Sequence, residues 1–216
     1  MVELISWTQD MSGRSLEEYI AYVARVSNPG NQVNAENSVR LIDYLIDHEH
    51  WSPFEMASIC LSVTTTRDIA RQMLRHRSFS FQEVSQRYAA TTLLTPMAEP
   101  VREARMQDRA NRQNSLPVAS EELAAEWLAQ QRQARQAAAK AYVWALEQGI
   151  AKEVARAVLP EGLTTSRLYM SGTVRSWIHY IALRTKPETQ KEHREIAVEC
   201  AKAIAKVFPK IEEFVA

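Results

Sequence analysis

The sequence contains few of the residues on which thiol chemistry depends. Cysteine occurs only as Cys60 and Cys200, and no CxxC motif is present. Two isolated thiols make neither a disulfide framework nor a thiolate zinc site. Because both lie on amphipathic segments, we interpret them as core residues rather than nucleophiles. With no disulfide framework to suggest export, we expect a cytoplasmic protein.

Glycine is also scarce. The five glycines never form a GxG pair, so GxGxxG is absent, and a Rossmann nucleotide site or a P-loop is therefore excluded. No serine lies in a GxSxG motif, which argues against a hydrolase of that type. His48 and His50 flank Glu49 without the HExxH spacing of a zinc site. We expect no metal, and place these histidines at the negative end of a helix instead.

Long apolar runs are missing as well. No stretch approaches the roughly 20 apolar residues that cross a bilayer, and the opening MVELISWTQD has no basic region before an apolar one, unlike a secretory signal. We therefore expect no membrane partner. The 26 basic and 26 acidic side chains give a formal net charge of +0, which argues against a general nucleic-acid binder. The 216 residues can enclose a sizeable core, and we expect a single domain over residues 1–216.

Periodicity and capping signals predict a mainly helical chain with a few strands. A capping box from Ser15 to Glu18 opens the first helix, and the alternating segment 58–63 predicts a strand. The polar segment 96–119 predicts a surface loop or lid. Further helices are predicted from about Glu36 to before Trp51, at 67–77, at 120–148, around Arg156 up to Pro160, at about 172–184 and at about 187–208.

Positive charge is concentrated in one segment of this neutral chain. Between residues 67 and 87, the acids Asp68 and Glu83 are outnumbered by five arginines, namely Arg67, Arg71, Arg75, Arg77 and Arg87. On the predicted helix, Gln72, Arg75 and His76 are spaced i, i+3 and i+4, so their heads should converge. Arg77 falls on the apolar side, which is costly unless the helix has ended or an anion lies opposite.

A strand is predicted over 82–88, with Glu83, Ser85 and Arg87 on one side of it. The helix end and this strand could then face each other across one anion. Forked guanidinium donors suit phosphate, so the cluster favours a phosphorylated small molecule over a basic patch. Three other side chains have ordinary interpretations when taken singly: Arg156 and Arg184 as solvated or paired arginines, and His179 as a core histidine.

The stretch RHRSFSFQEVSQRY resembles the signature of the flavin-dependent thymidylate synthases: Arg-His-Arg, seven residues, then Ser. These are Arg75, His76, Arg77 and Ser85. Other blocks are similar to the family in the same order, and the resemblance covers most of the chain: Ala24–Ser27, His50–Glu55, Ala70–Gln72, Glu153–Pro160 and Leu183–Arg184. It implies an α+β fold, in which a mainly helical chain with a long helix in its second half surrounds a small, mostly antiparallel sheet, and a homotetramer whose subunits share each site.

The resemblance also implies roles for single residues. The flavin-binding residues would be Ser52, Arg75, His76, Arg77, Glu83, Thr173, Arg175 and His179. The dUMP-binding residues would be Gln72, Arg75, Glu83, Ser85, Gln86, Arg87, Arg156 and Arg184. Arg184 and Ser85 would take part in the chemistry, Arg184 by favouring ionisation of the uracil ring at N3. Two positions depart from the family: Glu188 stands where a histidine is expected, and Thr173 where an asparagine often occurs.

The implied reaction is reductive methylation of dUMP to dTMP. Methylenetetrahydrofolate would supply the carbon and FAD, reduced by NADPH, the hydride, so no cysteine nucleophile is needed. Two other functions stay open at this point. A related flavoenzyme that adds a hydroxymethyl group would share the same pocket. A nucleic-acid-binding module would explain the arginines by phosphate contacts, and a flavin spectrum would exclude it.

Overall fold

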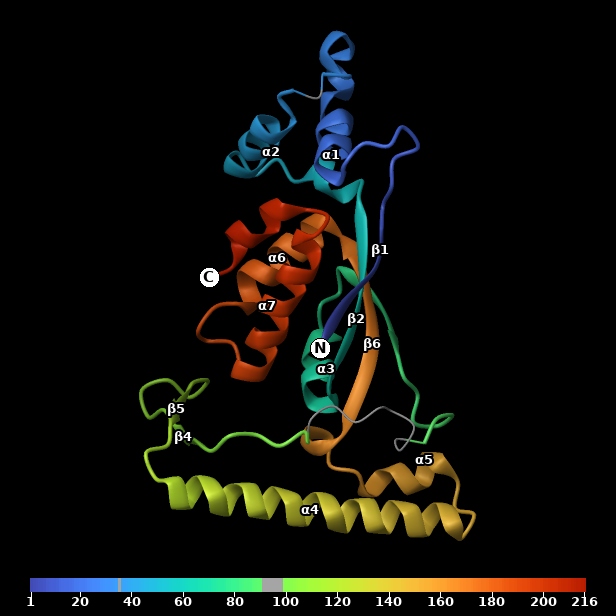
Figure 1. Ribbon diagram of the computed structural model, residues 1–216, viewed down its shortest axis with the longest axis vertical. Helices are drawn as coiled ribbons and strands as arrows, with labels where there is room; N and C mark the ends of the chain where they lie inside the picture. Colours follow the sequence, from blue (N-terminus) through green and yellow to red (C-terminus); the bar gives the residue numbers. More distant parts are fainter. Residues whose placement is uncertain (35, 91–98) are drawn as a thin grey trace.

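The computed structural model describes residues 1–34, 36–90 and 99–216 (Figure 1). Its strands are β1 (Val2–Trp7), β2 (Ser58–Thr66), β3 (Phe79–Glu83), β4 (Arg105–Gln107), β5 (Ser115–Pro117) and β6 (Thr165–Thr173). Its α-helices are α1 (Leu16–Ala24), α2 (Ser38–Asp47), α3 (Arg67–Met73), α4 (Glu121–Glu147), α5 (Lys152–Ala155), α6 (Val174–Arg184) and α7 (Lys191–Ala205). Short 3₁₀ turns include η3 (Ser52–Glu55), η5 (Arg156–Val158), η6 (Glu161–Leu163) and η7 (Pro209–Phe214).

A four-stranded antiparallel sheet in the order β1-β2-β6-β3 lies at the centre of the fold. Side chains alternate along each strand, so Leu61 and its register partner Met170 point to the same face. Both are fully buried, as are Val63 and its partner Leu168. The expected α+β fold with a small antiparallel sheet is confirmed.

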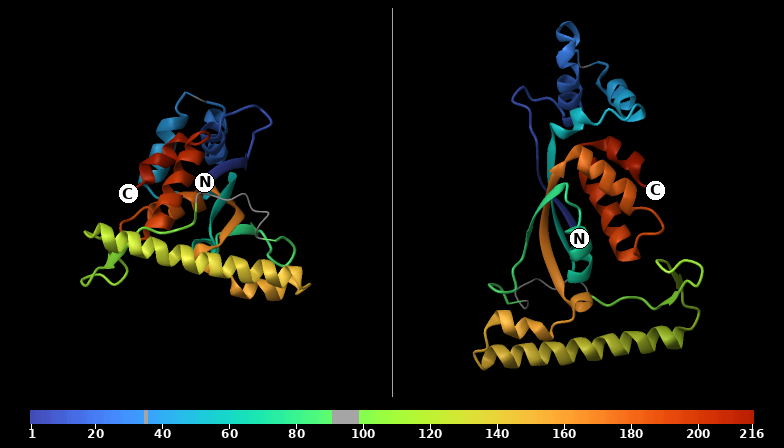
Figure 2. Two further views of the ribbon diagram at one scale, coloured as in Figure 1. Left: turned by 60° about the horizontal axis from the view of Figure 1, so that its bottom comes forward. Right: turned by 180° about the vertical axis from the view of Figure 1, so that it is seen from behind.

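Helices α3, α6 and α7 cover the apolar face of this sheet. Figures 1 and 2 show α6 and α7 side by side on one side of the strands. Trp177 on α6 is fully buried, and its Nε1–H donates to the Ile59 carbonyl at 3.0 Å, which ties the helix to β2. Cys200 on α7 is buried in the same core. Its interpretation as a core residue is confirmed, whereas Cys60, on the other face of β2, is only half-buried.

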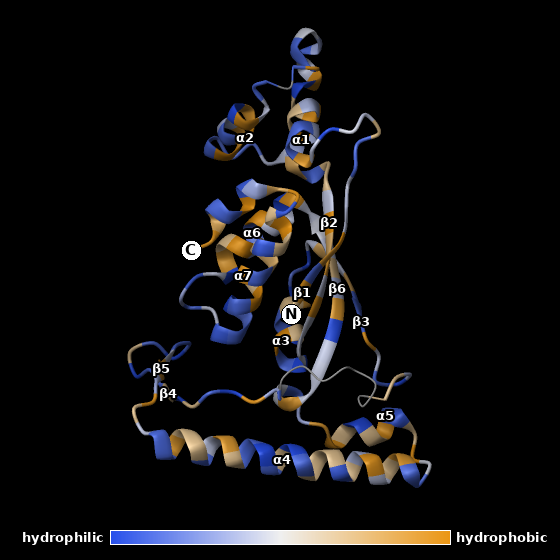
Figure 3. Cartoon of the chain, in the orientation of Figure 1, coloured by the Kyte–Doolittle hydropathy of each residue, from blue (hydrophilic) through white to orange (hydrophobic). Residues whose placement is uncertain are grey.

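The long helix α4 forms as predicted. The Ser120 side chain caps its first turn by accepting from Leu123 N, and Gly149 takes a φ of 76° just beyond its end, a backbone conformation that favours glycine. Polar and apolar residues alternate along its exposed surface (Figure 3). A small cluster of Tyr142, Ala145 and Ala155 packs α4 against α5. No helix of the described part of the chain is long and apolar enough to cross a membrane.

The segment 67–88 differs from its prediction. Helix α3 ends at Met73, because the chain must reverse to pair Phe79 with Gly172 on β6. The strand therefore begins and ends earlier than expected. After Glu83, the backbone turns, with Ser85 O accepting from the N–H groups of Tyr88 and Ala89. The prediction of a strand over 82–88 that shows Glu83, Ser85 and Arg87 on one side is wrong.

One of the two central strands, β6, was not predicted. No element was predicted for most of β6, and a helix was expected from about residue 172. That helix is α6, which begins at Val174, directly after the strand. Leu168 and Met170 alternate with Arg167 and Tyr169, a period of two that could have revealed the strand. The 96–119 segment is exposed as predicted where it is described, but β4 and β5 form a hairpin within it. Residues 96–98 of that prediction lie outside the described part.

The contact between Gly172 and Phe79 gives a test of this register. A Cβ on Gly172 would lie 2.4 Å from Phe79 Cδ1, and Phe79 is held by Trp177 with ring centroids 4.8 Å apart. Gly172→Ala should therefore lower the free energy of unfolding by about 1–3 kcal/mol, as overpacked cores do. Urea denaturation would measure the change. Gly30→Ala, which meets nothing within 4 Å, is the matched control, and equal stability of the two variants would contradict the register.

Candidate functional site

Gln72, His76 and Arg184 lie together where α3 and α6 end. The Arg184 Nε–H donates to His76 Nε2 at 2.9 Å. The His76 ring also packs edge-on against Tyr180, with centroids 4.9 Å apart. Gln72 is joined to the same cluster through His193, whose Nδ1 lies 3.1 Å from Gln72 Oε1. Gln72 and His76 therefore belong to one cluster, but the predicted convergence with Arg75 is not found, because α3 ends at Met73 and Arg75 is exposed outside the cluster.

Both histidines of this cluster are held neutral. Burial, followed by the positive charge of Arg184, lowers the pKa of His76 from 6.5 to about 4. Burial, then Arg184 and His76, lower the pKa of His193 to about 3. Because His76 Nε2 accepts from Arg184, its proton is on Nδ1. A neutral imidazole beside a guanidinium orients the cation without neutralising it, so Arg184 keeps its full charge.

A second group surrounds the first turn of α6. Thr173 caps the helix by accepting from Ser176 N at 3.2 Å, and Arg175 pairs with Glu55 of η3. His179 is exposed and contacts Trp51, with ring centroids 4.9 Å apart. The interpretation of His179 as a core histidine is therefore wrong. This group contains four of the predicted flavin-binding residues, namely Ser52, Thr173, Arg175 and His179. Ser52 is the first residue of η3 and is exposed.

A third group forms a cavity of about 360 Å³, which we call the arginine pocket. It is lined by Arg67, Arg71, Gln86, Glu153, Arg156, Ala157, Leu159 and Glu161. Gln86 is only 5% exposed, and its Nε2 has no hydrogen-bond partner among the described residues. A buried amide donor without a partner is uncommon in folded proteins. The pocket therefore combines guanidinium charge with an unsatisfied donor, which suits an anion.

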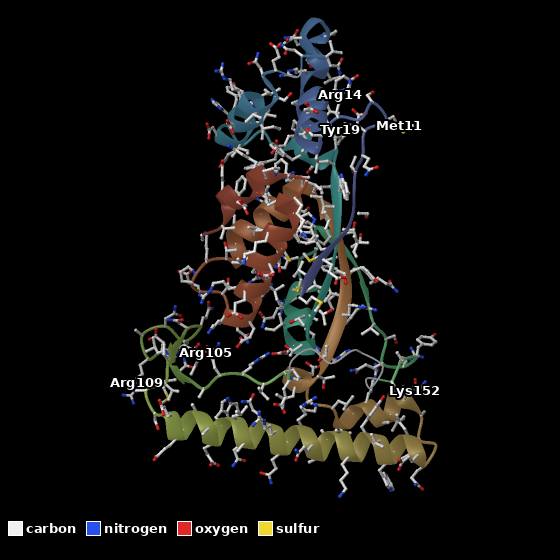
Figure 4. The ribbon with its side chains drawn as sticks, in the orientation of Figure 1. Met11, Arg14, Tyr19, Arg105, Arg109 and Lys152 are labelled. Atoms are coloured by element: carbon white, nitrogen blue, oxygen red, sulfur yellow. The ribbon has the colours of Figure 1, made fainter. Side chains whose placement is uncertain are left out.

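The turn of residues 85–88 is attached to this pocket. Arg87 Nε lies 3.3 Å from Glu153 Oε2, and Lys152 Nζ donates to the Tyr88 carbonyl at 2.9 Å (Figure 4). Ser85 is half-buried, and its Oγ accepts from Arg87 N at 3.3 Å. The predicted residues Ser85, Gln86, Arg87 and Arg156 are thus brought together, although not by a strand.

Glu83 lies deeper, beside the pocket. Its Oε1 accepts from Ser166 Oγ at 2.6 Å and lies 3.6 Å from Arg67 Nη1. Arg71 pairs with Glu161. The expectation that acids do not balance the arginine cluster is therefore wrong in part, because Glu153 and Glu161 reach it from a distant part of the sequence.

Arg75 and Arg77 remain exposed on the segment between α3 and β3. Within the described ranges neither makes an ion pair. The position of Arg77 on the apolar side of a helix does not occur, because α3 ends at Met73. For Arg77 the sequence predicts either that the helix has ended or that an anion lies opposite, and the structure shows that the helix has ended.

The first and second groups share helix α6, and the arginine pocket shares helix α3 with the first group. In the part of the chain that the structure describes, no hydrogen bond or ion pair joins the arginine pocket to Arg184 or His179. Sequence reasoning counted Arg67 and Arg71 but assigned them no role. It also missed His193 and Tyr180, which lie at ordinary buried positions of their helices and carry no motif. His48 does lie at the C-terminal end of α2, as expected.

Comparison with known proteins identifies the family. The model of the family described as "thymidylate synthase complementing protein" matches residues 4–210. A probable flavin-dependent thymidylate synthase of Paramecium bursaria Chlorella virus 1 is 50% identical over 195 residues, covering 90% of this chain and 88% of that protein. The flavin-dependent thymidylate synthase of Synechocystis is 50% identical over 206 residues, covering 91% and 88%. The chain belongs to the flavin-dependent thymidylate synthase family. It is an enzyme of that family.

The fold of this family member agrees with a solved structure. A UMP/dUMP methylase, PolB from Streptomyces cacaoi, crystallised with 5-Br dUMP, superposes with a TM-score of 0.82 at 30% sequence identity. The match covers 99% of this chain and 93% of that chain. The likeness therefore extends over the sheet and the long helix together.

The low pKa values of His76 and His193 predict a pH dependence of stability. Between pH 6.5 and about 4, the unfolded chain binds protons that the native imidazoles do not, so acidification through this range should lower the free energy of unfolding. Urea denaturation at about pH 7 and about pH 5 measures this slope. His76→Gln should reduce it, whereas Ile204→Val, a buried change without a titratable group, should not. Equal slopes in both variants would contradict the neutral native state of His76.

Proposed function

We propose that this enzyme converts dUMP to dTMP by reductive methylation, with methylenetetrahydrofolate as the carbon donor and FAD, reduced by NADPH, as the hydride source. The observation that carries the proposal is the arginine pocket. Gln86, with its unpartnered Nε2, and Arg156 line a cavity beside Ser85 and Arg87. Arginine and amide donors of this kind are suited to a nucleotide phosphate.

Arg71 of the pocket and the neighbouring Arg87 can release their present partners at low cost. The Arg87–Glu153 and Arg71–Glu161 pairs are both largely exposed. Exposed ion pairs contribute little to stability, and a phosphate dianion carries more charge than the carboxylate it would replace. The pocket is therefore suited to exchanging a carboxylate for the phosphate of dUMP.

Arg184 is the candidate for activating the uracil ring. Its Nε is bound to the neutral His76, and the guanidinium is half-buried. A cation in a partly buried site stabilises negative charge more strongly than one in water. We propose that it favours ionisation at N3, and that Ser85 acts close to the reacting nucleotide.

The exposed arginines and the α6 group fit a flavin. Arg75 and Arg77 are free of ion pairs in the described ranges and could hold the phosphates of FAD, while His179 and Trp51 offer an aromatic surface for its ring system. Ser52, Thr173 and Arg175 would add polar contacts around it. When bound, FAD supplies the hydride, and the protein residues bind and orient it.

Neither thiol suits the role of a nucleophile. Burial raises the pKa of Cys60 and raises that of Cys200 far above its usual range. The thiolate is the reactive form, so both cysteines are held in the unreactive state. This supports a mechanism that uses Arg184 and the flavin in place of a thiol.

Among the described residues, the arginine pocket makes no hydrogen bond or ion pair with Arg184 or His179, and this supports a shared site. If each complete site needs the arginine pocket, Arg184 and the α6 group, then more than one copy of the chain must contribute. We propose a homotetramer of single-domain subunits, working in the cytoplasm.

An anaerobic assay with dUMP, methylenetetrahydrofolate, FAD and NADPH tests the function, with the product identified by mass. We expect a yellow protein and dTMP formation. A hydroxymethyl product would favour a related nucleotide-modifying flavoenzyme instead. A colourless protein that does not take up FAD would overturn the flavin assignment.

Binding and activation should fail separately. Arg87→Ala removes a charge-assisted phosphate contact that is present throughout the reaction. The KM for dUMP should therefore rise by the factor that corresponds to a loss of about 1.5–3 kcal/mol of binding free energy. Arg184→Ala removes stabilisation of developing charge, so kcat should fall by about a hundredfold or more. NADPH oxidation should continue in the Arg184 variant. An Arg184 variant with unchanged kcat and only a raised KM would rule out activation by Arg184.

A further inference from the structure

Gln72 belongs to a row of hydrogen-bonded polar side chains that connects α6, α3 and the start of α7. Tyr180 Oη lies 3.0 Å from His193 Nε2, and His193 Nδ1 lies 3.1 Å from Gln72 Oε1. Gln72 Nε2 donates to Gln190 Oε1 at 2.7 Å. Gln190 Nε2 donates in turn to Glu192 Oε2 at 2.9 Å. No member of this row belongs to the signature motif.

The carboxylate at one end of the row fixes the direction of every hydrogen bond. An ionised Glu192 can only accept, so Gln190 must turn its Nε2 towards it and its Oε1 towards Gln72. Gln72 must then donate from Nε2, which leaves its Oε1 facing His193. His193 Nδ1 must therefore carry the proton, and its bare Nε2 accepts from the Tyr180 hydroxyl.

Glu192 is held in the ionised state by its neighbours. Arg105, on the hairpin strand β4 (Figure 4), donates to Glu192 Oε1 at 2.6 Å. Burial acts to raise the pKa of Glu192, but hydrogen bonds from Gln190 and Arg105 outweigh it and lower the pKa below its usual range. The row therefore begins from a fixed charge.

This direction determines which group Gln72 offers to the site. A primary amide nitrogen carries two hydrogens, and Gln190 takes one of those on Gln72 Nε2. The second is left for a ligand, while Oε1 is turned inward to His193. With the amide reversed, an oxygen would occupy this position, and it could not donate to a phosphate oxygen of the nucleotide.

We infer that His193 is a positioning residue for nucleotide binding, which holds the Gln72 amide so that it presents an N–H donor to dUMP. The inference rests on the proposed function and on a contact between Gln72 and dUMP, the role that the family resemblance implies for this residue. His193 is fully buried, with 0% of its surface exposed, so it can act on the nucleotide only through neighbouring side chains, and we assign this role to the Gln72 amide that it contacts. Its effect should fall on nucleotide binding and leave the chemical step unchanged.

Two amide substitutions separate the two ring nitrogens. The Asn side chain can place its amide nitrogen near the position of Nδ1, whereas the Gln amide reaches the position of Nε2. His193→Gln should therefore lose the donor to Gln72 and raise the KM for dUMP by about tenfold, with kcat and flavin uptake unchanged. His193→Asn should restore most of the lost affinity. Ile204→Val, another buried change on α7, controls for a general loss of stability.

A double-mutant cycle with Gln72 tests the route of the effect. Gln72→Ala should raise the KM for dUMP, and adding His193→Gln to it should cause no further change, because the two act through one contact. Independent, multiplying effects of the two substitutions would overturn the inference. So would a fall in kcat in His193→Gln at unchanged KM.

The tautomer of His193 can be tested in the wild-type protein, so this test does not depend on whether a variant folds. Nitrogen-15 chemical shifts of the wild-type imidazole should show the proton on Nδ1, and a proton on Nε2 would overturn the inference. Its failure is distinct from that of the proposed function. If the wild-type enzyme neither binds nor converts dUMP, the proposed function fails. If it converts dUMP but His193 carries its proton on Nε2, only this inference fails.

Discussion

The antiparallel ladder between β2 and β6 is the constraint on which the site depends. It pairs residues continuously from Ser58↔Thr173 to Thr66↔Thr165, and each strand passes directly into a helix, β2 into α3 and β6 into α6. Because the strands run in opposite directions, the two helices start at opposite ends of the ladder and run back along the same apolar face. Their C-terminal ends meet, and the Arg184–His76 contact lies at that junction.

The junction explains an otherwise unfavourable combination of groups. Two neutral histidines and a guanidinium share a partly buried space, where each imidazole would be costly to charge next to Arg184. The C-terminal ends of helices carry partial negative charge, which favours a cation such as Arg184 in the last turn of α6. The fold therefore retains one positive charge at this point and suppresses two others. A single, oriented cation is what activation of a neutral ring would require.

Much of this could be predicted from the sequence, for physical reasons that differ between elements. The Ser15 capping box and the helix over 120–148 were predicted from local signals and formed as expected, and the Ser120 cap and Gly149 bound that helix. The end of α3 is different, because pairing of Phe79 with Gly172 joins segments far apart in sequence and overrides helical spacing.

The candidate site also combines residues that the sequence indicated with residues that only long-range contacts bring together. Its flavin and nucleotide residues were named from a resemblance, and the structure brings most of them into three groups. Sequence reasoning could not find His193 or Gln190, because their roles arise from hydrogen bonds between α3 and α7. Nor could it find Glu153 and Glu161 as partners of the arginines, since those pairs form only when η6 and α5 fold against α3 and the turn after β3.

Those carboxylate partners account for the local arginine excess in a neutral chain. Five like charges between residues 67 and 87 would repel one another in a compact fold without counter-charges. Glu153 and Glu161 supply them from the surface, where the pairs are weak because solvent screens them. Glu83, by contrast, lies beside Arg67 with both side chains mostly buried. The inner pair thus stabilises the architecture of the pocket, while the outer pairs balance its charge and can open for a stronger anion.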